Sequence, residues 1–312
     1  MIADAGFYLE FDAFDRFGFP KGIARVTAGH GGESLLISGS EKTALLDCGM
    51  AYCAGGLIEN IERELGGRSL DFVLLSHTHY DHIGALPFIR RRWPGATTFG
   101  AAHARAVLQK QGAIKTINSL SEQAGVLYEG EVKFRIPDEG FAVDRIVGDG
   151  DKISLGAEEF NVLETKGHTD CSLSFGFEPL GVLFLSESTG CLDGYEMMHV
   201  SILKSYREAM ASVEKCRNYG AKTLVSPHYG LIPEYYNERY WDLFVSETEG
   251  YKEFLFGLFA SGLPEEVILE KYSEKYWNAR RKAVQPKDAF LLNARNVIKV
   301  FYDEFRAGGE GR

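Results

Sequence analysis

The sequence predicts a mixed α/β fold over residues 1–232, followed by an all-helical extension over residues 233–312. Two observations lead to this fold class. In the first region, short apolar segments typical of strands alternate with amphipathic segments typical of helices, and several strands follow one another through tight turns. From Pro233 onward the strand pattern stops. This order favours sheets covered by helices over a purely parallel, doubly wound sheet.

The elements of the first region follow from their local patterns. Residues 54–65 carry apolar residues at helical spacing and end at a pair of glycines, which is a helix stop signal. Residues 148–151, "GDGD", are typical of a turn. Residues 113–146 show the least regular pattern and are interpreted as an insertion. Strands are predicted at 34–38, 43–49, 71–76, 96–101, 152–156, 159–165, 173–177, 181–187 and 221–228, and further helices at 103–112 and 202–220.

The extension is predicted to contain three amphipathic helices, at 234–260, 264–277 and 288–305, before a polar, glycine-rich end at residues 306–312 that we expect to fray. In the first of them Tyr236, Tyr240 and Phe244 share one helical face. We expect this aromatic stripe to pack on the core of the protein. A role in lining an apolar substrate pocket is the second interpretation.

The composition limits the classes of partner. The net charge of −10 argues against general binding to nucleic acid, because phosphates require a broad basic surface. No apolar run reaches the ~20 residues of a membrane span, and the acidic N-terminal segment lacks the pattern of a secretory signal. Five cysteines without paired spacing indicate reduced thiols and therefore a cytoplasmic location. A small-molecule substrate is expected, with neither nucleic acid nor membrane as partner.

Three histidines and an aspartate lie within six positions of "SHTHYDH", directly after an apolar strand. In an extended chain residues i and i+2 point the same way, so His77 and His79 should present both imidazoles to one point. Asp81 and His82 follow where the chain turns into a helix, and they can face a second point nearby. This layout suits two metal ions ~3.5–4 Å apart that share a water. Packing explains it poorly, because each buried imidazole would need its own partner.

Residues of the same chemistry recur after three later strands. His168 follows "FNVLET", Glu187 ends "VLFLSE" and His228 follows "TLVSP". Strand ends are the usual place for the active sites of α/β proteins, so these three side chains are candidates for the same site. No role is assigned to the remaining histidines, His30, His103 and His199.

In these motifs the chain resembles the metallo-β-lactamase superfamily of metal-dependent hydrolases, whose signature H-x-H-x-D-H precedes three separated ligands. The resemblance covers about residues 29–230, where "LLDCG", "LSHTHYDHIGALP", "KGHTDCS", "VLFLSES" and "SPHYG" occur in the family's order. It implies a four-layer αβ/βα sandwich that binds two divalent ions, for which zinc, iron and manganese are candidates. It also implies that His77, His79 and His168 hold the first ion, that Asp81, His82 and His228 hold the second, that Glu187 bridges both, and that Asp47 orients a ligand.

Two positions depart from the family pattern. The bridging residue is usually aspartate, whereas Glu187 stands here, and its extra methylene group can alter the bridge or limit the site to one ion. Asp193 is a less favoured substitute for it. Lys166 stands where the family has proline before the third ligand, and we expect its side chain to point to solvent.

Hydrolysis of an activated acyl ester is the expected reaction. Two bound ions would lower the pKa of a shared water and so provide a hydroxide nucleophile. Asp81 would orient it and handle its proton, and Tyr229 and Tyr195 are candidate hydrogen-bond donors to the oxyanion. The length, "SHTHYDHIGALPFI" and the three-helix tail resemble those of the quinolone-signal response thioesterases, and glyoxalase II also carries a helical C-terminal domain. Both resemblances imply a thioester substrate. A thiolate leaving group, with a pKa near ~8.5, needs little acid assistance.

Other functions are compatible with the same residues. A lactonase or a phosphodiesterase would use the same site, and only the substrate distinguishes them. A redox di-iron protein of the flavodiiron type is disfavoured, because His79 stands where those proteins carry glutamate. The departure at Glu187 leaves a non-catalytic, metal-binding regulator as an alternative. A homodimer is also compatible with the helical tail.

Overall fold

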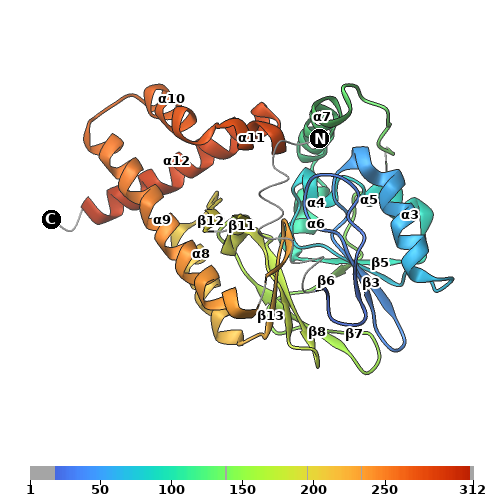
Figure 1. The fold of residues 1–312 in the computed structure, drawn as a ribbon. Helices are drawn as coiled ribbons and strands as arrows, with labels where there is room; N and C mark the ends of the chain where they lie inside the picture. The colour runs from blue at the N-terminus through green and yellow to red at the C-terminus, as the bar shows by residue number, and fades with distance from the viewer. Residues whose placement is uncertain (1–17, 138, 195, 233, 310–312) are drawn as a thin grey trace.

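The computed structural model describes residues 18–137, 139–194, 196–232 and 234–309, which form an α/β sandwich with a helical region at its C-terminal end (Figure 1). The first sheet has the order β1-β2-β3-β4-β5-β6, with strands at Ile23–Arg25, Leu35–Ser38, Thr43–Leu46, Phe72–Leu74, Thr97–Gly100 and Arg145–Ile146. The second has the order β14-β13-β10-β9-β8-β7, with strands at Gly230–Ile232, Thr223–Ser226, Val182–Phe184, Leu173–Glu178, Glu159–Glu164 and Lys152–Ser154. A separate ribbon pairs β11 (Cys191–Gly194) with β12 (Met197–His199).

Helices flank both sheets (Figure 1). The helices on the side of the first sheet are α3 (Ala54–Leu65), α4 (Tyr80–Ile83), α5 (Leu86–Arg92), α6 (Ala102–Leu108) and α7 (Gln111–Glu129), and α8 (Tyr206–Tyr219) lies on the side of the second. Alternating side chains explain these layers, because successive residues of a strand face opposite sides of the sheet. In β10, Val182 and Phe184 join a core shared with the first sheet, whereas Leu183 joins the core formed with α8. The four-layer α/β sandwich predicted from the sequence is therefore confirmed.

Four α-helices of the described chain form the C-terminal region: α9 (Asn237–Ala260), α10 (Glu265–Tyr276), α11 (Ala279–Val284) and α12 (Lys287–Gly309). The aromatic stripe of Tyr236, Tyr240 and Phe244 is buried in the same core as α8, as expected. The Tyr240 hydroxyl donates a hydrogen bond of 2.7 Å to the carbonyl of Gly190, three residues after Glu187. The first helix of the extension is thus fixed to the segment that carries Glu187.

The structure adds elements that the sequence did not predict, among them the strands β1, β6, β11, β12 and β14. The irregular region 113–146 contains most of α7, a 19-residue helix that the sequence analysis missed. The short helix α11 was also not predicted. The polar end is helical as far as Gly309, so the fraying predicted from residue 306 was wrong for the described part of that segment. Within the described ranges, no helix combines the length and apolar character needed to span a membrane.

Candidate metal centre

The polar residues predicted for the site all follow the carboxyl ends of strands. His77 lies three residues after β4, His168 four residues after β8 and His228 two residues after β13. Glu187 begins the short 3-10 helix η2 (Glu187–Thr189), which follows β10. The two sheets therefore deliver these side chains from opposite halves of the sandwich to one place.

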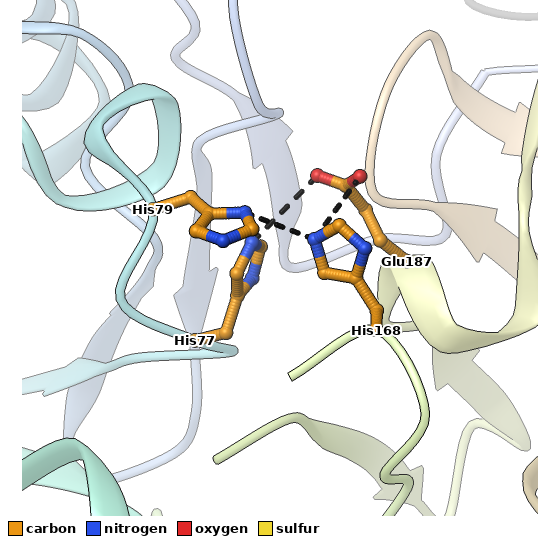
Figure 2. A group of neighbouring side chains, drawn as sticks. All are labelled: His77, His79, His168 and Glu187. Atoms are coloured by element: carbon orange, nitrogen blue, oxygen red, sulfur yellow. Dashed lines mark hydrogen bonds and ion pairs between the residues drawn. The ribbon is translucent and has the colours of Figure 1, made fainter. Parts of the chain in front are cut away.

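One group of potential ligand atoms comes from His77, His79, His168 and Glu187, and these atoms all lie within 4.8 Å of one another. Figure 2 shows the three imidazoles and the carboxylate pointing toward a common point. His79 Nδ1 lies 2.9 Å from His168 Nε2, and the carboxylate of Glu187 lies 3.4 Å from the same atom. A cation at this point would be in reach of every one of these donors.

A second group comprises Asp81, His82, Glu187 and His228, and its potential ligand atoms also lie within 4.8 Å of one another. His82 Nε2 and His228 Nε2 lie 3.2 Å apart, and Asp81 Oδ2 lies 3.6 Å from His228 Nε2. The structure thus brings together all seven side chains that the sequence singled out as ligands, in the two groups that the family resemblance implied.

Glu187 belongs to both groups. Its Oε1 atom lies 2.9 Å from His82 Nε2 and 3.1 Å from His228 Nε2, whereas its Oε2 atom faces His168. The residue is only 7% exposed, and burial disfavours its charged form. The electrostatic effect of the neighbouring His168 and the hydrogen bonds with His228 and His82 outweigh burial, so the pKa of Glu187 is held well below its usual range. A carboxylate that stays ionised between the two groups can contact a cation in either.

Hydrogen bonds behind the imidazoles fix which nitrogen faces the centre. His168 Nδ1 donates to the carbonyl of Ser201 at 2.7 Å, and His82 Nδ1 donates to Asp47 Oδ2 at 2.9 Å. The Ser76 hydroxyl donates its single proton to Asp47, so it accepts from His77 Nδ1 at 3.0 Å. Because Nδ1 is engaged in this way, each ring turns its Nε2 atom toward the centre, which is the usual arrangement of metal-binding histidines.

His77 provides a direct test of whether these residues fit a metal. Its Nε2 atom is completely buried and has no hydrogen-bond partner within the described residues, which is unusual for a buried polar atom. Burial and the neighbouring imidazoles also hold the pKa of His77 well below 6.5, and burial with His168 lowers that of His79 to about 3. Both rings are therefore neutral near pH 7 and able to donate lone pairs. The residues fit a divalent cation.

Asp47 supports the centre from outside, as the family resemblance implied. Besides His82 it accepts hydrogen bonds from the backbone and the hydroxyl of Ser76, at 2.8 and 2.6 Å. Its backbone is left-handed, with φ of 54°, a conformation that aspartate and asparagine tolerate better than most residues. One strained residue therefore orients ligands of both groups.

We expect Asp47→Asn to weaken metal binding by about 10–100-fold, the usual effect of losing an outer hydrogen-bond partner. Asparagine can keep the backbone conformation, but its amide nitrogen only donates, so it cannot replace the oxygen that accepts from the Ser76 hydroxyl and from His82 Nδ1. Metal titration of the metal-free variant by calorimetry measures the change. An affinity equal to that of the wild type would show that Asp47 does not orient the ligands.

The centre opens into a cavity of about 370 Å³, within the usual range for small-molecule sites. His79, Asp81, Glu187 and His228 contribute to its lining, and so does Tyr229. Tyr195, the other tyrosine predicted to act on the oxyanion, lies outside the described residues. Asp193 lies in β11, and Lys166 pairs with Glu164 at 3.1 Å and is partly exposed.

The lining of the cavity includes residues that the sequence did not indicate as part of the site. The three histidines that received no role, His30, His103 and His199, all line it. They come from a loop, from α6 and from β12, so no spacing in the sequence relates them to the ligand motifs. Side chains from α7, α11 and α12 line the same cavity, and of these helices α7 and α11 were not predicted from the sequence.

Comparison with known proteins agrees with this geometry. The family model described as "Metallo-beta-lactamase superfamily" matches residues 28–228. Among curated relatives, a hydroxyacylglutathione hydrolase of Nitrobacter hamburgensis is 29% identical over 172 residues, covering 53% of this chain and 52% of that protein. A protein of the same name from Klebsiella pneumoniae is 27% identical, covering 42% and 41%. The chain thus spans about half the length, or less, of these relatives.

Solved structures show the same fold. A metallo-beta-lactamase family protein from Thermus thermophilus superposes with a TM-score of 0.62 at 19% identity, over 93% of this chain and 95% of its own. A metallo-beta-lactamase superfamily protein from Sulfolobus tokodaii gives a TM-score of 0.57 at 19% identity, over 75% and 87%. The family model matches residues 28–228, and the sandwich and the two groups of potential ligands agree with it. The chain therefore belongs to the metallo-beta-lactamase superfamily.

Proposed function

We propose that the protein is a metal-dependent hydrolase of activated acyl esters, with thioesters as its substrates. The observation that carries the proposal is the position of the Glu187 carboxylate, which belongs to both groups of ligand atoms and lines an open cavity. Imidazole and carboxylate donors without thiolate suit zinc, iron or manganese. The proposed ligands of two such ions are His77, His79, Asp81, His82, His168, Glu187 and His228.

A pair of divalent ions would lower the pKa of a bound water and polarise a carbonyl group. Side chains of the protein would hold the proton and stabilise the charge that develops during the reaction. Asp81 lines the cavity with a partly exposed carboxylate and belongs to the second group, so it can hold a proton next to the reacting carbonyl. Tyr229 also lines the cavity beside His228, and we assign it the role of a hydrogen-bond donor to the developing oxyanion.

Two arguments support thioesters over other acyl compounds. A thiolate leaves with little acid assistance, and the proposed roles include no strong general acid beside the leaving group. The curated relatives named hydroxyacylglutathione hydrolase carry the name of an enzyme that cleaves a thioester. Their low identity and partial coverage make this an argument about the class of substrate only.

The C-terminal helices have a proposed role in the same reaction. Arg281 and Val284 of α11 and Ala289 of α12 line the cavity opposite residues of α7 such as Thr116 and Ile117. We propose that residues 233–312 form an extension of the catalytic region 1–232 that covers the active-site side. Water would then have restricted access to the reacting carbonyl.

The proposal is tested by assaying metal-loaded protein on acyl-thioesters, lactones and phosphodiesters in parallel. We expect turnover of thioesters, its loss on removal of metal with a chelator, and its recovery when metal is returned. Elemental analysis of protein produced without added metal identifies the ions. Turnover of phosphodiesters alone would overturn the acyl assignment, and preference for lactones would move it to a lactonase. No turnover, combined with stabilisation by ligand, would identify a regulator.

A further inference from the structure

A second cavity of about 170 Å³ lies next to the main one. It is formed between β12 and the C-terminal helices, and residues of α9, α10 and α12 contribute to its lining. The ligand residues of the metal centre take no part in it. The reaction proposed above therefore leaves this space without a role.

The two cavities share one wall. The residues common to both linings are His199, Ser201, Arg281, Gln285 and Asn293. Ser201 joins this wall directly to the centre, because its carbonyl accepts the hydrogen bond from His168. Arg281, Gln285 and Asn293 are partly buried, polar side chains with several rotatable bonds. A change of rotamer in them would connect the space above the metal centre with the second cavity.

Aromatic rings form one part of the lining of the second cavity, and polar or charged side chains such as Glu247, Asn278 and Arg280 form another. Tyr251 and Tyr276 stack at 4.4 Å between ring centroids, and Tyr272 and Phe290 lie beside them at 6.1 Å from each other. Ala294 and Val297 of α12 add small apolar surface and are almost completely buried. Its volume resembles that of the engineered apolar cavity of ~150 Å³ that binds benzene. The space is therefore large enough for one six-membered ring, with the aromatic part of the lining to receive it.

We propose that this second cavity is a subsite for the uncharged, ring-sized end of the acyl group. The inference rests on the proposed acyl hydrolase function. The reacting carbonyl must lie at the metal centre, so the two halves of a thioester extend from there in different directions. A thiol carrier larger than one ring cannot enter about 170 Å³ and must leave through the main cavity. The acyl end is then the half that passes the wall of His199 and Arg281.

Ala294→Leu tests the subsite, because Ala294 lines the second cavity and not the main one. The measured quantity is the ratio of kcat/KM for a phenylacetyl thioester to that for the acetyl thioester of the same thiol. We expect the leucine to fill the space and to lower this ratio by about tenfold or more. The matched control is Ala307→Leu, at an exposed position of the same helix, and it should keep the wild-type ratio.

Phe290→Leu is a second test, in which the cavity becomes larger instead of smaller. Its outcome does not depend on whether a leucine side chain can be accommodated at position 294. It enlarges the cavity, so the ratio for a naphthylacetyl thioester over the acetyl thioester should rise several-fold. Unchanged ratios in both variants would overturn the subsite while leaving thioester hydrolysis intact.

If no thioester is hydrolysed at all, the proposed function fails. The subsite is then tested separately, by whether a small aromatic compound binds in the second cavity. Benzyl alcohol soaked into crystals of the wild type and of Ala294→Leu is the probe. A ring seated among Tyr251, Tyr272 and Phe290 in the wild type only would support the subsite. Absence of the ring from that place in the wild type would overturn it.

Discussion

Glu187→Ala is expected to reduce hydrolysis by at least about 10²–10³-fold and to lower the amount of bound metal. The carboxylate is the one group that faces both sets of ligand atoms within the described residues, so its loss weakens both metal positions together. Its buried surroundings make the loss larger, because the imidazoles of His82 and His228 would face each other without an anion between them. Elemental analysis and kcat/KM on one thioester measure the two effects.

Two further variants make the experiment on Glu187 specific. Glu64→Ala removes an exposed glutamate of α3 far from the ligand motifs and should behave as the wild type. Glu187→Asp restores the residue usual in the family and should retain metal better than alanine does. If Glu187→Ala kept both metal and activity, the bridging role would be wrong, and the centre would depend on the histidines and Asp81.

Gly32→Ala has the second largest expected effect, because the glycine lies directly against His82. A Cβ atom at this position would come within 2.4 Å of Cε1 and Nδ1 of the His82 ring. The backbone has little freedom to retreat, since the nitrogen of Gly32 donates to the carbonyl of Asp81 at 2.9 Å and that of Glu33 donates to Pro227 at 2.8 Å. His82 must therefore turn away from Asp47 and Glu187.

For Gly32→Ala we expect a free energy of unfolding lower by about 1–3 kcal/mol, as for other overpacked sites. Metal affinity should fall by about 10–100-fold, as when an outer hydrogen bond is lost. Denaturant unfolding of the metal-free protein and metal titration separate the two. Gly250→Ala is the control, because this glycine is exposed within α9 with open space around it, and alanine there should stabilise the helix slightly. Unaltered metal binding in Gly32→Ala would mean that His82 is not a ligand.

The ligand motif was readable in the sequence because it is local. His77, His79, Asp81 and His82 lie within six residues, and their separation along the chain fixes their positions relative to one another. His168, Glu187 and His228 were found by a weaker signal, the position of each after an apolar strand, and the family resemblance grouped them. The long helix α7 was missed because its apolar residues, such as Ile117 and Ala124, are diluted by glycine, serine and threonine on the same stretch.

The sequence by itself determined the α/β class, the helical tail and the identity of the candidate ligands. All three depend on the period of apolar residues and on chemistry carried by short motifs. Only the tertiary structure decided which oxygen of Glu187 faces which imidazole, and that His30, His103 and His199 share the cavity with the centre. Only the structure revealed the second cavity behind the wall of His199 and Arg281. These features arise where segments that are separate in the sequence pack together, and the spacing of residues along a chain does not record such packing.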